Sequence, residues 1–289
     1  MVSVGTLKNK FQIFNRLQQT WLVVSMLLIC SPGLKADVLL LVHGYQGNVM
    51  SWERGGDTPV LQHFGWKRAA VLLAAPNGLV PIPMQWHDAE NKVVLLQMNT
   101  ESSLQVQAAV VTAAMRWVND HYPDESLVVA GHSLGGVSSR LALVRDGANN
   151  VKALITIASP HLGTVLAYRG LDELDDPWPL RLFKSMFGGK VYDRLRRSRG
   201  LLHDIVPEVP GKLLYWLNTR QHPPIRYFSI VRSSMNGALG DPIVPGYSQD
   251  MGNVKAIGQR STRIIQGFTH WLNVLDGYAL INILEQLED

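Results

Sequence analysis

The stretch LVVAGHSLGG, residues 127–136, places a G-x-S-x-G pattern between an apolar run and a helical pattern. The apolar run contains three β-forming residues, and an Ala- and Leu-rich segment with helical periodicity follows at residues 137–144. A strand, a sharp turn and a helix are the context in which a serine is exposed as a nucleophile. Such a turn strains the backbone and leaves no room for side chains on either side of the serine, which Gly131 and Gly135 satisfy. The alternative is a chance glycine-rich turn, but the flanks favour a catalytic Ser133.

The composition is that of a globular protein with one large core: 289 residues, 46% hydrophobic and 17% charged. The formal net charge of +4 arises in residues 1–36, because the remainder has 23 basic and 23 acidic residues. The basic balance therefore belongs to the N-terminal segment and gives no indication of nucleic-acid binding.

Residues 1–36 are typical of a signal peptide. Basic residues precede the apolar run 21–30, and Ala36 offers a small residue for cleavage. The run is too short to span a bilayer as a mature helix, although an uncleaved anchor remains the alternative. Cys30, the only cysteine, lies inside this segment. We therefore expect an exported protein, periplasmic or secreted, without disulfides.

Apolar strand patterns alternate with helical patterns from residue 37 onward. The runs that predict strands are 38–42, 69–74, 127–129, 151–157, 225–231 and 262–265. The segments that predict helices are 59–64, 101–121, 137–144 and 271–287. The stretch with Pro81 and Pro83 is interpreted as irregular. This alternation predicts an open, mainly parallel α/β sheet flanked by helices, with reactive groups at the carboxyl ends of its strands.

Residues 162–224 interrupt the alternation with helical patches and no buried-strand run, which predicts a cap or lid above the sheet. Basic residues lie among its apolar ones: Arg181, Lys184, Lys190, Arg194, Arg196, Arg197 and Arg199. One interpretation is transient contact with an anionic membrane surface. The other, which we favour, is a solvated helix face over a buried stripe, paired with the acidic residues just upstream.

A serine hydroxyl needs a base and a third group that orients the base. His270 is the histidine that comes just beyond the last predicted strand, a placement that weakens the alternative of a capping or solvated residue. Asp241 lies in the loop GDPIVP, where the following proline extends the backbone. Its rivals for the orienting role are Asp250, further along the same loop, and Asp276 in the terminal helix.

A developing oxyanion needs two backbone N–H donors. One is expected from Leu134, the residue after the serine. The other is expected from Tyr45, because Gly44 lets the loop after the first strand turn closely. His43 is interpreted as a structural hydrogen-bonding residue.

Five segments in this order resemble the α/β-hydrolase superfamily, in particular secreted bacterial lipases and GPI inositol-deacylase-like hydrolases. They are residues 43–47, 131–136, 159–163 and 240–245, and His270. The order Ser, Asp, His is the one that this superfamily uses. The resemblance implies that Ser133 is the nucleophile, His270 the base and Asp241 its orienting acid, with Tyr45 and Leu134 as oxyanion donors.

The resemblance also implies a minimal α/β-hydrolase fold, with a sheet of about six strands in a domain of residues 37–289. Some secreted lipases bind calcium, but the residues after His270 do not match that pattern. We therefore predict no metal and no cofactor.

We expect hydrolysis of carboxylic esters with apolar acyl chains through an acyl-enzyme intermediate, the substrate being an ester or a lipid. An acyltransferase would use the same residues and differ only in how it excludes water, and a peptidase or thioesterase would also fit the machinery. The alternative from another class is a non-catalytic binding protein on this scaffold.

Overall fold

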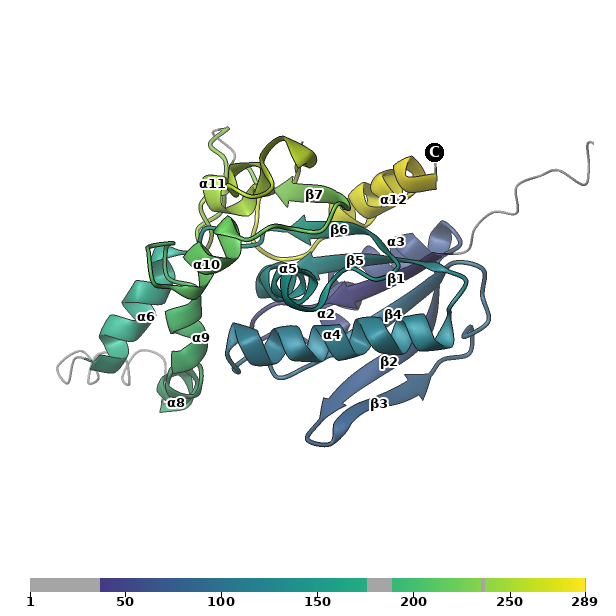
Figure 1. Cartoon of the computed structure of the whole chain (residues 1–289), viewed down its shortest axis with the longest axis horizontal. Helices are drawn as coiled ribbons and strands as arrows, with labels where there is room; N and C mark the ends of the chain where they lie inside the picture. Colours follow the sequence, from purple (N-terminus) through teal and green to yellow (C-terminus); the bar gives the residue numbers. More distant parts are fainter. Residues whose placement is uncertain (1–36, 176–188, 235–236, 289) are drawn as a thin grey trace, which may run out of the picture. The chain divides into compact units, whose positions relative to one another are not determined.

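The computed structural model describes residues 37–175, 189–234 and 237–288, so the predicted signal peptide lies outside the described residues. In this part of the chain, eight strands form one sheet with the order β3-β2-β4-β1-β5-β6-β7-β8 (Figure 1). The strands are β1 (Asp37–Val42), β2 (Lys67–Ala75), β3 (Gly78–Pro83), β4 (Lys92–Gln97), β5 (Ser126–His132), β6 (Val151–Ile157), β7 (Arg226–Val231) and β8 (Ser261–Ile265). Adjacent strands run parallel, except that β3 pairs antiparallel with β2.

The α/β class with a mainly parallel sheet is as predicted, but the sheet is larger than the predicted six strands. Neither β3 nor β4 is among the predicted strands: β3 lies in the stretch interpreted as irregular, and β4 lies between that stretch and the predicted helix 101–121. Pro81 and Pro83 belong to β3, an edge strand, where a residue without a backbone N–H is tolerated. The second strand, β4, is an apolar run buried between β1 and β2.

Helices cover both faces of the sheet, so its central strands are buried on both sides. One face packs against α4 (Leu104–His121) and α5 (Leu134–Asp146). The other face packs against α3 (Asp57–His63) and α12 (Val274–Glu288).

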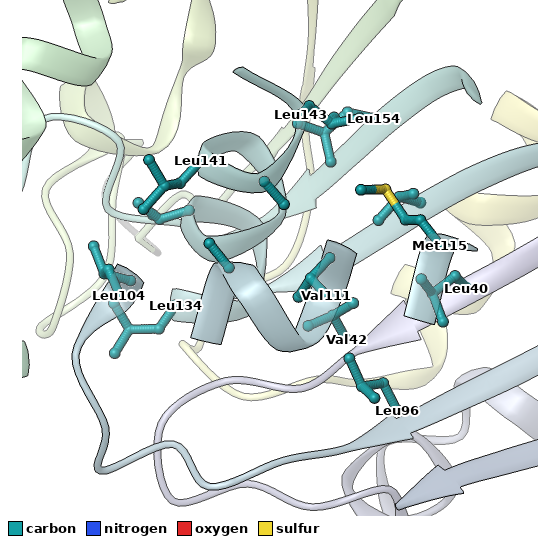
Figure 2. Packing of buried hydrophobic residues seen from close by; sticks show 14 of the residues in the cluster. Leu40, Val42, Leu96, Leu104, Val111, Met115, Leu134, Leu141, Leu143 and Leu154 are labelled. Atoms are coloured by element: carbon teal, nitrogen blue, oxygen red, sulfur yellow. The ribbon is translucent and has the colours of Figure 1, made fainter. Parts of the chain in front are cut away.

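Strand β1 shows how the pleat divides the core. Leu40 and Val42 point to the α4 side, where Figure 2 shows them with Val111 and Met115. Leu39 and its alternating neighbours belong to the cluster on the opposite face. Successive side chains of a strand point to opposite faces, so one continuous apolar run supplies both layers of the core.

Between β6 and β7 the chain leaves the sheet and forms four helices in its described part (Figure 1). They are α6 (Val165–Asp175), α8 (Gly189–Arg197), α9 (Arg199–Asp204) and α10 (Leu213–Thr219). These helices occupy the region in which the sequence predicts a cap. The remaining helical elements are α2 (Met50–Gly55), α11 (Gly246–Gln249) and the 3₁₀ turns Met251–Asn253 and Gly258–Arg260.

The cap is attached to the loops at the carboxyl ends of the strands. The Tyr45 hydroxyl lies 2.9 Å from Oγ of Ser198. Asp204 accepts a 2.9 Å hydrogen bond from the first backbone N–H of α4. The guanidinium of Arg197 donates to the carboxylate of Glu101. Three contacts, one each from α8, α9 and the residue between them, therefore hold this part of the cap beside the sheet.

The basic residues of the cap are only partly described. Arg181 and Lys184 lie outside the described residues, as does the side chain of Lys190. Arg194 donates a 2.7 Å hydrogen bond to Gln46 and lies 3.7 Å from the carboxylate of Glu101. Contacts within the chain thus occupy this basic side chain.

Among the described residues, none of the helices combines the length and apolar character that crossing a bilayer requires.

Candidate active site

The turn between β5 and α5 holds Ser133 in a strained conformation, with φ 52° and ψ −124°. Positive φ is uncommon for a residue with a side chain, and it persists only where the surroundings enforce it. A Cβ at Gly131 would lie 2.4 Å from the backbone nitrogen of Gly136. A Cβ at Gly135 would lie 2.3 Å from the carbonyl oxygen of Val42. Both flanking positions therefore exclude a side chain, as the pattern predicts.

The structure brings together three of the predicted site residues. Nε2 of His270 lies 2.9 Å from Oγ of Ser133, and its Nδ1 lies 3.0 Å from Oδ2 of Asp241. A carboxylate only accepts hydrogen bonds, so Nδ1 carries the proton and Nε2 accepts from the serine hydroxyl. Ser133 is 6% exposed and His270 is 7% exposed, so the pair is largely shielded from water.

Asp241 is held by four donors. Its Oδ1 accepts from the backbone N–H groups of Ile243 at 2.8 Å and Val244 at 2.9 Å. Its Oδ2 accepts from the Gln249 amide at 2.8 Å as well as from His270. Burial raises the pKa of Asp241, but the hydrogen bond and charge of His270 and the two backbone donors outweigh it, so the pKa lies below its usual value. The carboxylate is therefore ionised at neutral pH and able to stabilise an imidazolium.

The two rival carboxylates have other partners. Asp250 accepts from the backbone N–H of Gly252 at 2.7 Å and lies 3.3 Å from the guanidinium of Arg263. Asp276 forms a buried ion pair with Arg232. The structure thus places Asp241 beside the imidazole and uses the other two elsewhere.

His132, the first variable position of G-x-S-x-G, also contacts the base. Its Nε2–H donates a 2.8 Å hydrogen bond to the backbone carbonyl oxygen of His270. Burial lowers the pKa of His132 to about 3, and the charge of His270 contributes to the shift. The ring is therefore neutral and holds the loop that carries the base. Sequence reasoning missed this role, because the pattern says nothing about its variable positions.

A buried ion pair anchors the same loop from the other side. Arg232, directly after β7, contacts both carboxylate oxygens of Asp276 at 2.5 and 2.8 Å, and both side chains are 0% exposed. The guanidinium also donates 3.1 Å hydrogen bonds to the carbonyl oxygens of Gln266 and Trp271, on either side of His270. No pattern in the sequence indicates this role, since the partners come from separate elements.

The loop after β1 lies against the serine. A Cβ at Gly44 would be 2.8 Å from Cβ of Ser133, so only glycine allows this approach. Tyr45 and Leu134 line the cavity that Ser133 and His270 also line. The two predicted oxyanion donors are therefore next to the nucleophile, and their N–H roles stay a prediction.

His43 is fully buried beneath this loop. Its Nε2 accepts from the backbone N–H of Met98 at 3.3 Å, so Nδ1 donates to the carbonyl of Gly44 at 3.1 Å. Burial lowers the pKa of His43, which keeps the ring neutral. The histidine thus connects the end of β1 to the end of β4.

A cavity of about 280 Å³ adjoins Ser133 and His270. Most of its other walls are apolar side chains of the cap and neighbouring loops, including Leu166, Ala167, Leu195, Leu202, Ile205 and Val244. Within the described ranges, no group of three or more histidine, cysteine or acidic side chains is placed to hold a metal ion.

The fold and the arrangement of this site define an α/β hydrolase, the class that the sequence resembles. Within that class, residues 34–173 match the family model described as a PGAP1-like alpha/beta domain. A segment of 71 residues is 35% identical to a GPI inositol-deacylase of Debaryomyces hansenii, and it covers 22% of this chain and 7% of that protein.

Two solved bacterial structures share the fold. The product of gene lin2722 from Listeria innocua has a TM-score of 0.57 and 16% identity, covering 87% of this chain and 92% of that one. The mature lipase BlEst2 of Bacillus licheniformis has a TM-score of 0.58 and 15% identity, covering 88% and 93%.

Proposed function

We propose that this chain is a serine hydrolase that cleaves carboxylic esters of apolar acyl chains through an acyl-enzyme on Ser133. The observation that carries the proposal is the continuous hydrogen-bonded series from Asp241 through His270 to the serine hydroxyl. A base within hydrogen-bond distance of the nucleophile, oriented by a third group, is the arrangement that activates a serine.

In the first half-reaction, Oγ of Ser133 attacks the ester carbonyl carbon while its proton passes to Nε2 of His270. Asp241 stabilises the imidazolium, and the backbone N–H groups of Tyr45 and Leu134 stabilise the oxyanion. The bond between the carbonyl carbon and the alcohol oxygen then breaks, and that oxygen takes the proton from His270. The acyl group remains on the serine.

In the second half-reaction, a water molecule attacks the acyl carbon and gives a proton to Nε2 of His270. The bond from Oγ of Ser133 to the acyl carbon breaks, and Oγ recovers the proton. The carboxylic acid leaves and the site returns to its starting state.

The apolar cavity beside Ser133 supports the choice of acyl group. Burial of one CH₂ contributes about 0.8 kcal/mol, which corresponds to roughly fourfold in kcat/KM for each added carbon until the cavity is full. One similar protein is named a lipase and another a GPI inositol-deacylase, and both names support an acyl ester as the substrate class.

The test combines a fluorophosphonate probe with p-nitrophenyl esters of increasing acyl length. Ser133→Ala is expected to lose both labelling and hydrolysis. Asp241→Asn is expected to lower kcat by on the order of 10⁴, because the imidazole loses its orienting acid. Asp250→Asn is the matched control and is expected to keep kcat within a few-fold.

Three results would overturn parts of the proposal. Absence of labelling in the unmodified chain would favour a binding protein. Labelling without hydrolysis, together with transfer of the acyl group to an added alcohol, would favour an acyltransferase. A large loss of kcat in Asp250→Asn alone would reassign the orienting acid.

A further inference from the structure

A second cavity, of about 360 Å³, is lined in part by His132, the residue before the candidate nucleophile. Its walls come from the loop at residues 44–47, from Ser51, Arg54 and Gly55 of α2, and from the loop after His270. It meets the apolar cavity at four residues that line both: Tyr45, Gln46, His132 and Trp271. The site therefore has two compartments that join at the candidate oxyanion loop.

The two compartments differ in charge. Among the residues that line the second cavity, Arg54 is the one charged at neutral pH, since burial lowers the pKa of His132 to about 3. Within the described part of the chain no salt bridge involves Arg54, and the adjacent Glu53 instead accepts from Arg68 at 3.0 Å and from Thr58 at 2.6 Å. The compartment thus has an uncompensated positive charge.

An ester occupies both compartments when its carbonyl carbon faces Ser133, because its acyl and alcohol parts extend from opposite sides of that carbon. The apolar compartment suits the acyl chain, which leaves the polar one for the alcohol. We propose that the second cavity is the alcohol subsite, and that Arg54 binds an anionic group on the alcohol, such as a phosphate. This inference rests on the proposed function.

The anionic group takes no part in bond making. The alcohol oxygen still leaves with the proton from His270, and Arg54 contributes by binding the substrate. A charge-assisted hydrogen bond to an exposed arginine is expected to raise kcat/KM about tenfold, mainly through a lower KM. Salt screens such a pair, so the preference is expected to shrink as ionic strength rises.

The experiment compares two soluble substrates with the same acyl chain, 1-octanoylglycerol and 1-octanoylglycerol 3-phosphate, below the concentrations at which they form micelles. The readout is the ratio of their kcat/KM values, because a loss of folded protein lowers both rates and leaves the ratio unchanged. The variants are Arg54→Gln, Arg54→Lys and, as the matched control, Arg116→Gln on the exposed face of α4.

The unmodified chain is expected to favour the phosphate ester about tenfold at low salt. Arg54→Gln is expected to bring the ratio close to one, Arg54→Lys to keep most of it, and Arg116→Gln to leave it unchanged. A ratio near one in the unmodified chain, or one that Arg54→Gln does not alter, overturns the alcohol-subsite assignment. Ser133-dependent hydrolysis of p-nitrophenyl octanoate would show in that case that the proposed function itself still holds.

Discussion

Replacement of Asp57 by asparagine is expected to stabilise the protein at neutral and alkaline pH. Asp57 lies in the first turn of α3 and is 0% exposed, and neither of its carboxyl oxygens has a hydrogen-bond partner among the described residues. Burial raises the pKa of Asp57 to about 8, and the negative charge of Asp276 adds to the shift. The folded protein therefore keeps this carboxyl protonated at pH 7.

The magnitude follows from the difference between the folded pKa of about 8 and the ordinary value of 3.8. Between these pH values the folded state holds a proton that the unfolded state has released. The free energy of unfolding therefore falls by about 1.4 kcal/mol per pH unit across this window and levels off above it. The cost approaches a limit of about 6 kcal/mol above pH 8. Asparagine does not ionise, so Asp57→Asn removes this pH-dependent cost.

Urea unfolding at pH 5, 6.5 and 8 measures this effect. The stability gained by Asp57→Asn is expected to be small at pH 5 and largest at pH 8. Asp120→Asn, on the exposed face of α4, is the matched control and is expected to show no such trend. A gain that does not change with pH, or a loss at pH 8, would refute the reasoning.

Three further substitutions test the supports of the site. Arg232→Met leaves Asp276 buried without a counter-charge, so the free energy of unfolding measured in urea is expected to fall by about 3–5 kcal/mol. The double variant Arg232→Met, Asp276→Leu should recover most of this loss. A double variant as unstable as the single one would contradict this reasoning. Gly135→Ala places a Cβ 2.3 Å from a carbonyl oxygen and is expected to lower the Tm sharply or to prevent soluble expression, so an unchanged Tm would show that the turn adapts. His132→Phe removes the donor to the His270 carbonyl and is expected to lower kcat roughly 3- to 10-fold with little change in KM; an unaltered kcat would mean that other contacts suffice to hold the loop.

Local patterns explain what the sequence predicted of the fold. Parallel strands that are buried on both faces are recognised as short apolar runs. The glycines around Ser133 indicate a turn that has no room for side chains. The same reasoning missed β3, because its prolines suggest an irregular segment, and it also missed β4, although β4 is an apolar run. Those prolines are accommodated because β3 is an edge strand, and its position in the sheet is set by partners far along the chain.

The candidate site also has residues that the sequence predicts and others that it does not. Asp241 and His270 are predictable because each follows a predicted strand, and strand ends meet at one edge of a parallel sheet. Gln249, His132 and Arg232 hold those two residues through contacts across separate loops. Which loop atoms meet depends on tertiary packing, so no spacing in the sequence marks these three.

The two compartments that join at the candidate oxyanion loop affect the fate of the acyl group. On the proposed assignment, departure of the alcohol empties the second cavity while the acyl chain stays bound to the serine in the apolar one. The next molecule to reach the acyl carbon enters through the vacated space, and it competes there with the departing alcohol. The rate at which the first product diffuses away therefore decides whether water or a second alcohol completes the cycle.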